Sequence, residues 1–88
     1  MPRLDVRAVE KWTGNPVRNA RISLNDIRVM VGENQLATNE SGVATLDLTM
    51  GSAKICASAE GYETACQTLN VVANTATTII MTPIARAL

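Results

Sequence analysis

The two cysteines are the most reactive side chains in this 88-residue chain. Cys56 and Cys66 lie symmetrically about Gly61, so in a hairpin of 52–59 and 63–72 centred on that glycine they face each other. A disulfide needs Cβ atoms about 3.8 Å apart, which a facing cross-strand pair can approach. The pattern favours an intrachain disulfide. Two alternatives stay open: the cysteines are reduced thiols packed under another surface, or they take part in metal or redox chemistry. A bridge implies an oxidising location or a hyperthermophile's cytoplasm.

Other catalytic or metal-binding chemistry has little support. The chain has no His, which removes the usual general base and the commonest zinc ligand. Glu33, Glu40 and Asp47 could supply a carboxylate pair, but no spacing brings them together. Asp26 with Glu33 or Glu40 lacks the ligand spacing of a calcium loop. We therefore expect no catalytic residue, no metal, no cofactor and no enzymatic activity.

Composition narrows the class of protein further. Eight Lys and Arg balance eight Asp and Glu, and this argues against a nucleic-acid partner, which needs a basic surface. No apolar run approaches the roughly 18 residues that cross a bilayer, and the start has no signal-peptide core. The length predicts one domain over 1–88, with an aliphatic core because the chain has one Trp, one Tyr and no Phe. A domain this small is marginally stable unless an interaction beyond its own hydrophobic core stabilises it.

Alternation of apolar and polar residues dominates the chain, as in Leu4, Val6 and Ala8 against Arg3, Asp5 and Arg7. This period of two is typical of half-buried strands, and no window keeps a helical apolar face. Turn glycines, namely Gly14, Gly42, Gly51 and Gly61, punctuate the strands, and we expect a positive φ at Gly42 and Gly61. The predicted strands are 3–10, 19–25, 27–32, 35–38, 43–49, 52–59, 63–72 and 76–82. Short strands at this spacing predict an all-β sandwich or barrel.

Three blocks of the chain fit one family pattern: Thr13-Gly14-Asn15-Pro16-Val17 to Leu24, Thr38-Asn39-Glu40-Ser41-Gly42-Val43-Ala44, and Gly51-Ser52-Ala53 to Gly61-Tyr62-Glu63. Together they resemble the carboxypeptidase regulatory-like family. The resemblance covers almost the whole chain. It implies a transthyretin-like (prealbumin-like) Greek-key β-sandwich of about seven strands in two sheets.

The chain departs from the family pattern in two places. Ala53 stands where an aromatic residue is preferred, so either the sheets approach closely or Trp12, Met50 or a neighbouring subunit fills the space. The stretch 26–37 is longer than a simple connection, and we interpret it as an extra hairpin around Gly32-Glu33-Asn34. Tyr62 follows a turn and is expected to cover one end of the sandwich with its hydroxyl in water.

The segment from Thr75 to Met81 has high β propensity and no charge. We interpret it as the last sandwich strand; at an edge, such a strand invites pairing with another chain. Ile79 and Ile80 point to opposite faces, so one is exposed unless covered. The candidate assembly contacts are Leu4, Ile79, Ile80, Ile84 and Leu88. Asn39-Glu40-Ser41 is a glycosylation sequon that matters only in an exported chain, and chance explains it better.

These features favour a non-enzymatic structural module. The first hypothesis is a self-assembling subunit of an extracellular filament, surface layer or virion appendage. Under this hypothesis, the chain is a homo-oligomer or polymer with protein partners. It is located outside the cell, at the cell surface or on a virion. The alternative is an accessory binding or spacer domain, such as a spike-tip extension, an adhesin stalk unit or a carbohydrate-binding module.

Overall fold

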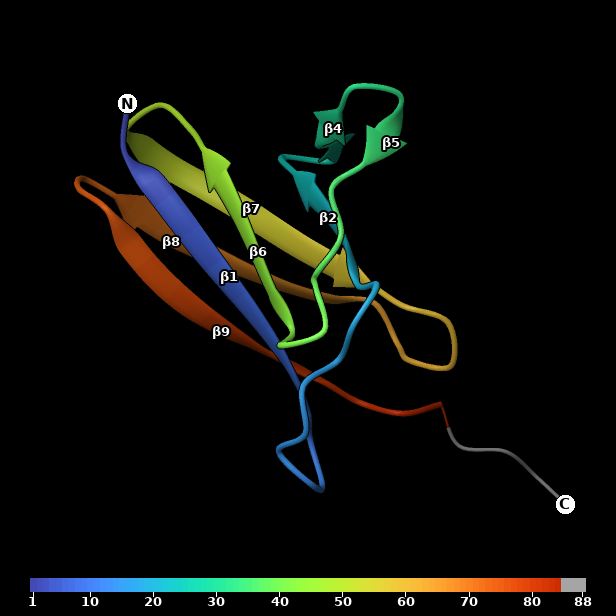
Figure 1. Cartoon of the computed structure of the whole chain (residues 1–88). Coiled ribbons are helices and arrows are strands. Elements are labelled where there is room, and N and C mark those ends of the chain that lie inside the picture. Colours follow the sequence, from blue (N-terminus) through green and yellow to red (C-terminus); the bar gives the residue numbers. More distant parts are fainter. Residues whose placement is uncertain (85–88) are drawn as a thin grey trace, which may run out of the picture.

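The computed structural model describes residues 1–84 (Figure 1), and every regular element in that range is a β-strand. This confirms the all-β fold predicted from the alternation. The nine strands are β1 (Arg3–Glu10), β2 (Arg21–Leu24), β3 (Ile27–Arg28), β4 (Met30–Val31), β5 (Asn34–Gln35), β6 (Val43–Asp47), β7 (Gly51–Ser58), β8 (Ala65–Val71) and β9 (Thr75–Met81).

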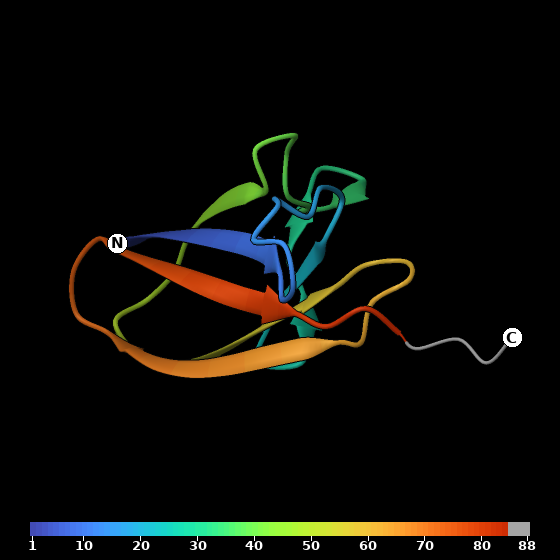
Figure 2. The same ribbon diagram turned by 90° about the horizontal axis from the view of Figure 1, so that it is seen from below.

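Seven of the strands form two sheets, in the orders β6-β1-β9 and β3-β2-β7-β8. Strand β1 runs antiparallel to β6 and parallel to β9, while β7 is antiparallel to both β2 and β8. The two sheets form separate layers, with β1 and β9 in one and β8 in the other (Figure 2). The fold is a Greek-key-like sandwich, with β8 and β9 adjacent in sequence but in different sheets.

The remaining two strands, β4 and β5, pair only with each other and project beyond the sandwich (Figure 1). Their turn contains Gly32 with a φ of 64°. This ribbon confirms the extra hairpin expected within 26–37. The predicted strand 27–32 is nevertheless wrong as one unit, because the chain pairs with β2 at Ile27–Arg28 and only then turns away as β4.

The core is aliphatic and follows the alternation of the strands. Its members include Leu4, Val6 and Ala8 from β1 and Ala53, Ile55 and Ala57 from β7, all of them buried. Trp12 and Met50 remain 73% and 68% exposed, so these two of the alternatives for filling the alanine-lined space are wrong. Met81 at the end of β9 is fully buried instead, and it is among the largest side chains in the core.

The four predicted turn glycines, Gly14, Gly42, Gly51 and Gly61, all have positive φ angles, between 72° and 128°. Gly42 is the most constrained of them by its surroundings. A Cβ atom there would lie 2.8 Å from both the Ala8 carbonyl oxygen and the Pro16 Cβ. Only glycine permits this approach of the 39–42 turn to β1, because any side chain would clash with backbone.

Strand β2 ends earlier than the alternation predicts. Asn25 and Asp26 both have positive φ angles, 51° and 68°, and Leu24 pairs directly with Ile27. Two residues with positive φ between paired strands make the type of tight turn that matches strand twist, and Asn and Asp tolerate it well. The predicted boundary at residue 25 therefore lies inside a turn.

Candidate functional site: the β8 and β9 edge and its disulfide

Two long strand edges lie on the same side of the sandwich. Strand β8 is outermost in one sheet and β9 is outermost in the other. The Thr77 hydroxyl of β9 donates a hydrogen bond to the Gln67 side-chain carbonyl of β8, so the two strands lie side by side across the open flank (Figure 2). Within residues 1–84, no further strand pairs with the outer edge of either one. We call these two strands the open edge.

The open edge carries no charge, since residues 64–85 contain no Lys, Arg, Asp or Glu. Natural proteins usually protect exposed strand edges with a charged residue, a proline, a bulge or a very short strand. The opposite edges follow that rule: β3 has two residues, including Arg28, and β6 ends on Asp47. The molecule therefore has a protected side and an unprotected side, each formed by one strand from each sheet.

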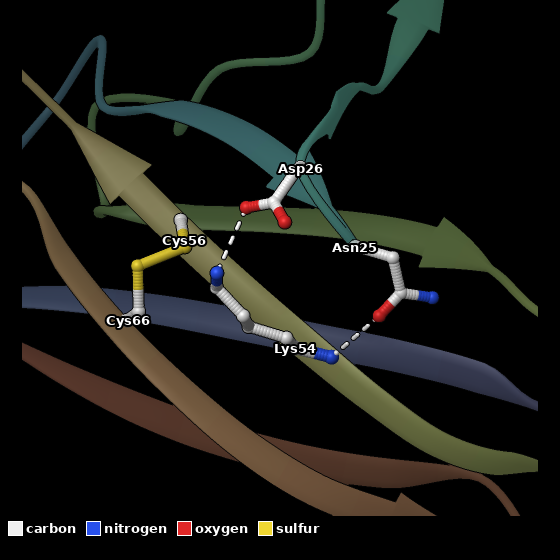
Figure 3. Close-up of a disulfide and its surroundings, with 5 residues drawn as sticks. All are labelled: Asn25, Asp26, Lys54, Cys56 and Cys66. Carbon is white, nitrogen blue, oxygen red and sulfur yellow. Dashed lines mark hydrogen bonds and ion pairs between the residues drawn. A yellow bond between two sulfur atoms is a disulfide. The ribbon is translucent and has the colours of Figure 1, made fainter.

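The disulfide predicted from the sequence is present. Cys56 of β7 and Cys66 of β8 are direct cross-strand partners with Cα atoms 4.0 Å apart, and their sulfur atoms are bonded (Figure 3). The bridge lies on the outer face of its sheet, because the neighbouring residues Ile55 and Ala57 point into the core. It links the edge strand β8 covalently to β7, which is paired on both sides.

A polar cluster lies beside the bridge (Figure 3). The backbone N–H of Lys54 donates to the Asn25 side-chain oxygen at 2.9 Å, and its ammonium group lies 2.8 Å from the Asp26 carboxylate. These contacts attach the turn after β2 to β7. Asp26 is well exposed, so the ion pair contributes little stability and the hydrogen bond fixes the turn. The sequence pattern did not identify this arrangement, because residues 25 and 54 are far apart in the chain.

The predicted assembly contacts fall into two groups. Leu4 and Ile79 are 0% and 3% exposed, so the prediction that they contact another subunit is wrong: alternation turns both into the core. Ile80 and Ile84 are 52% and 50% exposed and remain available. Ile80 lies on β9, on the face opposite to Ile79, as expected. Leu88 lies outside the described residues.

The candidate carboxylates lie on separate elements. Glu33 is in the turn between β4 and β5, Glu40 is in the loop before β6, and Asp47 ends β6. Asp26 pairs with Lys54. In the described part of the chain, no group of three or more His, Cys, Asp or Glu side chains is placed to hold a metal ion.

Tyr62 differs from its expected role. Its hydroxyl donates a hydrogen bond of 2.5 Å to a carboxylate oxygen of Glu10 on β1, so it is not simply hydrated. The hydrogen bond to Glu10 raises the pKa of Tyr62 above 10.0, and partial burial and the negative charge of Glu10 raise it further. The ring thus joins the loop after β7 to the other sheet.

Thr38 is a structural residue to which the sequence pattern assigned no role. It is the one buried polar side chain among residues 1–84. Its hydroxyl donates to the Val17 carbonyl at 2.6 Å and accepts from the Ala20 N–H at 2.9 Å. The next residue, Asn39, accepts hydrogen bonds from the backbone N–H groups of Ser41 and Val43, so the sequon forms a tight turn.

Comparisons with known proteins agree with the fold. No family model matches the chain, and no curated protein matches it by sequence. Residues 1–84 contain no helix that could span a membrane. The disulfide is typical of proteins outside the reducing cytoplasm. Among solved structures, the chain is similar to one described as the Bacillus anthracis TIE protein, with a TM-score of 0.63 and 12% identity over 93% of this chain and 16% of that chain. The likeness extends to the β-sandwich fold, and the chain corresponds to a small part of that longer protein.

Proposed function

We propose that this chain is a non-enzymatic structural module that assembles with copies of itself through the open edge. The assembly would be an extracellular filament, a surface layer or a virion appendage. The observation that carries the proposal is the uncharged open edge, in which two long edge strands lie side by side without a protecting charge. An edge strand presents unpaired N–H and C=O groups, and a second copy can pair with them.

The disulfide supports both the mechanism and the location. By linking β8 to β7, it keeps the edge strand in its sheet and ready for pairing. Pre-ordering of this kind lowers the entropy lost on association. A structural disulfide also persists in oxidising surroundings, which fits a subunit that works outside the cell.

We also propose that the sandwich is of the transthyretin-like type found in carboxypeptidase regulatory-like domains. Three supports are the sequence blocks around Gly14, Gly42 and Gly61, the seven strands in two sheets, and the parallel pairing of β1 with β9. Folds of this kind serve many functions, so the type of fold by itself assigns none.

A second candidate function is a spacer or accessory domain within a larger assembly. The observation that favours it is the similarity to the TIE protein, in which the matched fold makes up 16% of the chain. A spacer would stay monomeric and use the open edge for a different partner, or leave it unused.

The test compares two matched substitutions. Ile80→Lys places a charge on the open edge, while Ile27→Lys places the same charge on the protected edge strand β3, at a side chain that is also exposed. We expect the unmodified chain to form polymers in negative-stain images and in size-exclusion chromatography with light scattering. Ile80→Lys should weaken association about tenfold or more, because each junction would have to desolvate a charge that has no partner.

The two functions predict different results for the same samples. If the unmodified chain stays monomeric at every concentration tested, the assembly proposal fails and the spacer or accessory-domain hypothesis is favoured. If Ile80→Lys and Ile27→Lys weaken association equally, the open edge is not the contact between copies. Circular dichroism of both variants should match that of the unmodified chain, since neither side chain is in the core.

A further inference from the structure

A polar groove of about 490 Å³ is lined by residues that lie outside the open edge. Three segments form it: the turn before β2, the projecting β4–β5 ribbon, and the loop between β7 and β8. Its polar lining side chains include Arg18, Arg21, Asn34, Gln35, Glu60 and Tyr62. Concave sites with a few convergent polar groups are where proteins usually bind small molecules.

The extra hairpin builds one wall of this groove. Gln35 of β5 donates a side-chain hydrogen bond to the Ile22 carbonyl at 3.0 Å, which holds its amide against β2. Backbone hydrogen bonds from Ile22 to Leu36 and from Thr38 to Ala20 attach the end of the ribbon to β2 and to the residue before it. The hairpin is therefore fastened at its base, and the Gln35 amide is held in place.

The other two walls are also fixed by named contacts. The Thr38 hydroxyl binds the Val17 carbonyl and the Ala20 N–H, and so holds the turn that carries Arg18. Tyr62 is held by its hydrogen bond to Glu10 on the opposite sheet. A site whose walls are ordered before binding loses less entropy when a ligand enters.

The charges in the groove lack internal partners. Arg18 and Arg21 are exposed, and neither forms an ion pair with a carboxylate among the residues that the structure describes. A guanidinium group donates hydrogen bonds only, and its planar fork matches a carboxylate. The amides of Asn34 and Gln35 both donate and accept, and the Glu60 carboxylate accepts. The lining thus suits a ligand that carries a carboxylate together with several hydroxyl groups.

We propose that this groove binds an acidic saccharide, with the uronate carboxylate on Arg18 and Arg21 and sugar hydroxyls on the amides and Glu60. A neutral sugar would leave both guanidinium groups without an anion. An acidic peptide would offer few hydroxyls to the amides and to Glu60. The inference does not depend on self-assembly, because the groove and the open edge share no residue.

Isothermal titration calorimetry with tri-galacturonate on the full chain tests the proposal. We expect saturable binding in the millimolar range, and a loss of affinity of about tenfold in Arg18→Gln and in Arg21→Gln, since each removes a charged hydrogen bond. Arg28→Gln is the matched control, because Arg28 is an exposed arginine on β3 that does not line the groove.

Two further ligands decide which chemical class of ligand the groove binds. Maltotriose should bind much more weakly than tri-galacturonate, because it lacks carboxylates, and tri-glutamate should bind more weakly because it lacks hydroxyls. Equal binding of maltotriose or tighter binding of tri-glutamate overturns the proposal. So does an absence of tri-galacturonate binding, or an equal loss of affinity in all three arginine variants. None of these results bears on polymerisation, which the Ile80→Lys and Ile27→Lys pair tests separately.

Discussion

Tyr62 connects the loop after β7 to the central strand of the other sheet through one hydrogen bond to Glu10. The bond requires a protonated phenol facing a carboxylate, so it depends on pH. It also helps to shape one wall of the groove. The sequence indicated a ring at the end of the sandwich, but the partner is 52 positions away in the chain and only the folded structure places it there.

The phenol of Tyr62 should be a weaker acid than a free tyrosine. Tyr62 is the only tyrosine, so the absorbance of tyrosinate reports its pKa directly. We expect a midpoint above 10.0 in the folded protein, because ionisation would place two negative charges together. Glu10→Gln should bring the midpoint back toward 10.0. A midpoint that is the same in both proteins would show that Glu10 does not contact the hydroxyl in solution.

The same pair makes stability depend on alkaline pH. Below pH 10.0 the folded and unfolded chains both keep the phenol proton, and the contribution of the hydrogen bond is full. Above that value the unfolded chain loses its proton first, so stability falls until the folded protein also ionises. Tyr62→Phe should cost about 1 kcal/mol at neutral pH in urea unfolding, and this difference should shrink above pH 10.0.

At the scale of elements, the disulfide matters because β8 has a strand neighbour on one side only. Replacing both cysteines with serine should lower the free energy of unfolding by about 2–3 kcal/mol, the effect expected when a short loop in the unfolded chain is no longer closed. Hydrogen exchange should rise more in β8 than in β1, which is paired on both sides.

The control for that experiment is the unmodified protein in reductant, which should match the double serine variant. Mass spectrometry with and without reductant should differ by two hydrogens. If reduction alters neither the mass nor the stability, the cysteines are not bridged in solution. Uniform exchange over all strands would instead show that the bridge stabilises the whole sandwich rather than its edge strand.

Alternation predicted most strands but not all their ends. Residues 3–10 match β1, because buried Leu4, Val6 and Ala8 alternate with polar side chains over its whole length. The facing cysteines followed from the same period and from symmetry about Gly61. The end of β2 failed because Asn25 and Asp26 turn the chain through contacts with Lys54 of β7. Local periodicity contains no information about such a distant partner.

Features of the whole molecule were the least predictable. Leu4 and Ile79 looked like surface contacts because an apolar residue near a chain end can face inward or outward, and only sheet pairing decides which. The sequence showed that β9 is uncharged, but not that β8 lies beside it on one flank. The groove likewise combines Arg18, Gln35 and Glu60, which are brought together by the projecting ribbon and the loop after β7.

The distribution of charge leads to a prediction for the assembled protein. Eight positive and eight negative residues cancel, and none lies within β8 or β9, which form the open edge. Association through that edge should therefore depend little on salt, because screening acts on charges and the contact contains none. We expect the association constant from sedimentation to change less than about twofold between low and physiological ionic strength. Binding of tri-galacturonate to Arg18 and Arg21 should weaken severalfold over the same range. A steep loss of association with salt would mean that charged surfaces, and not the open edge, hold the copies together.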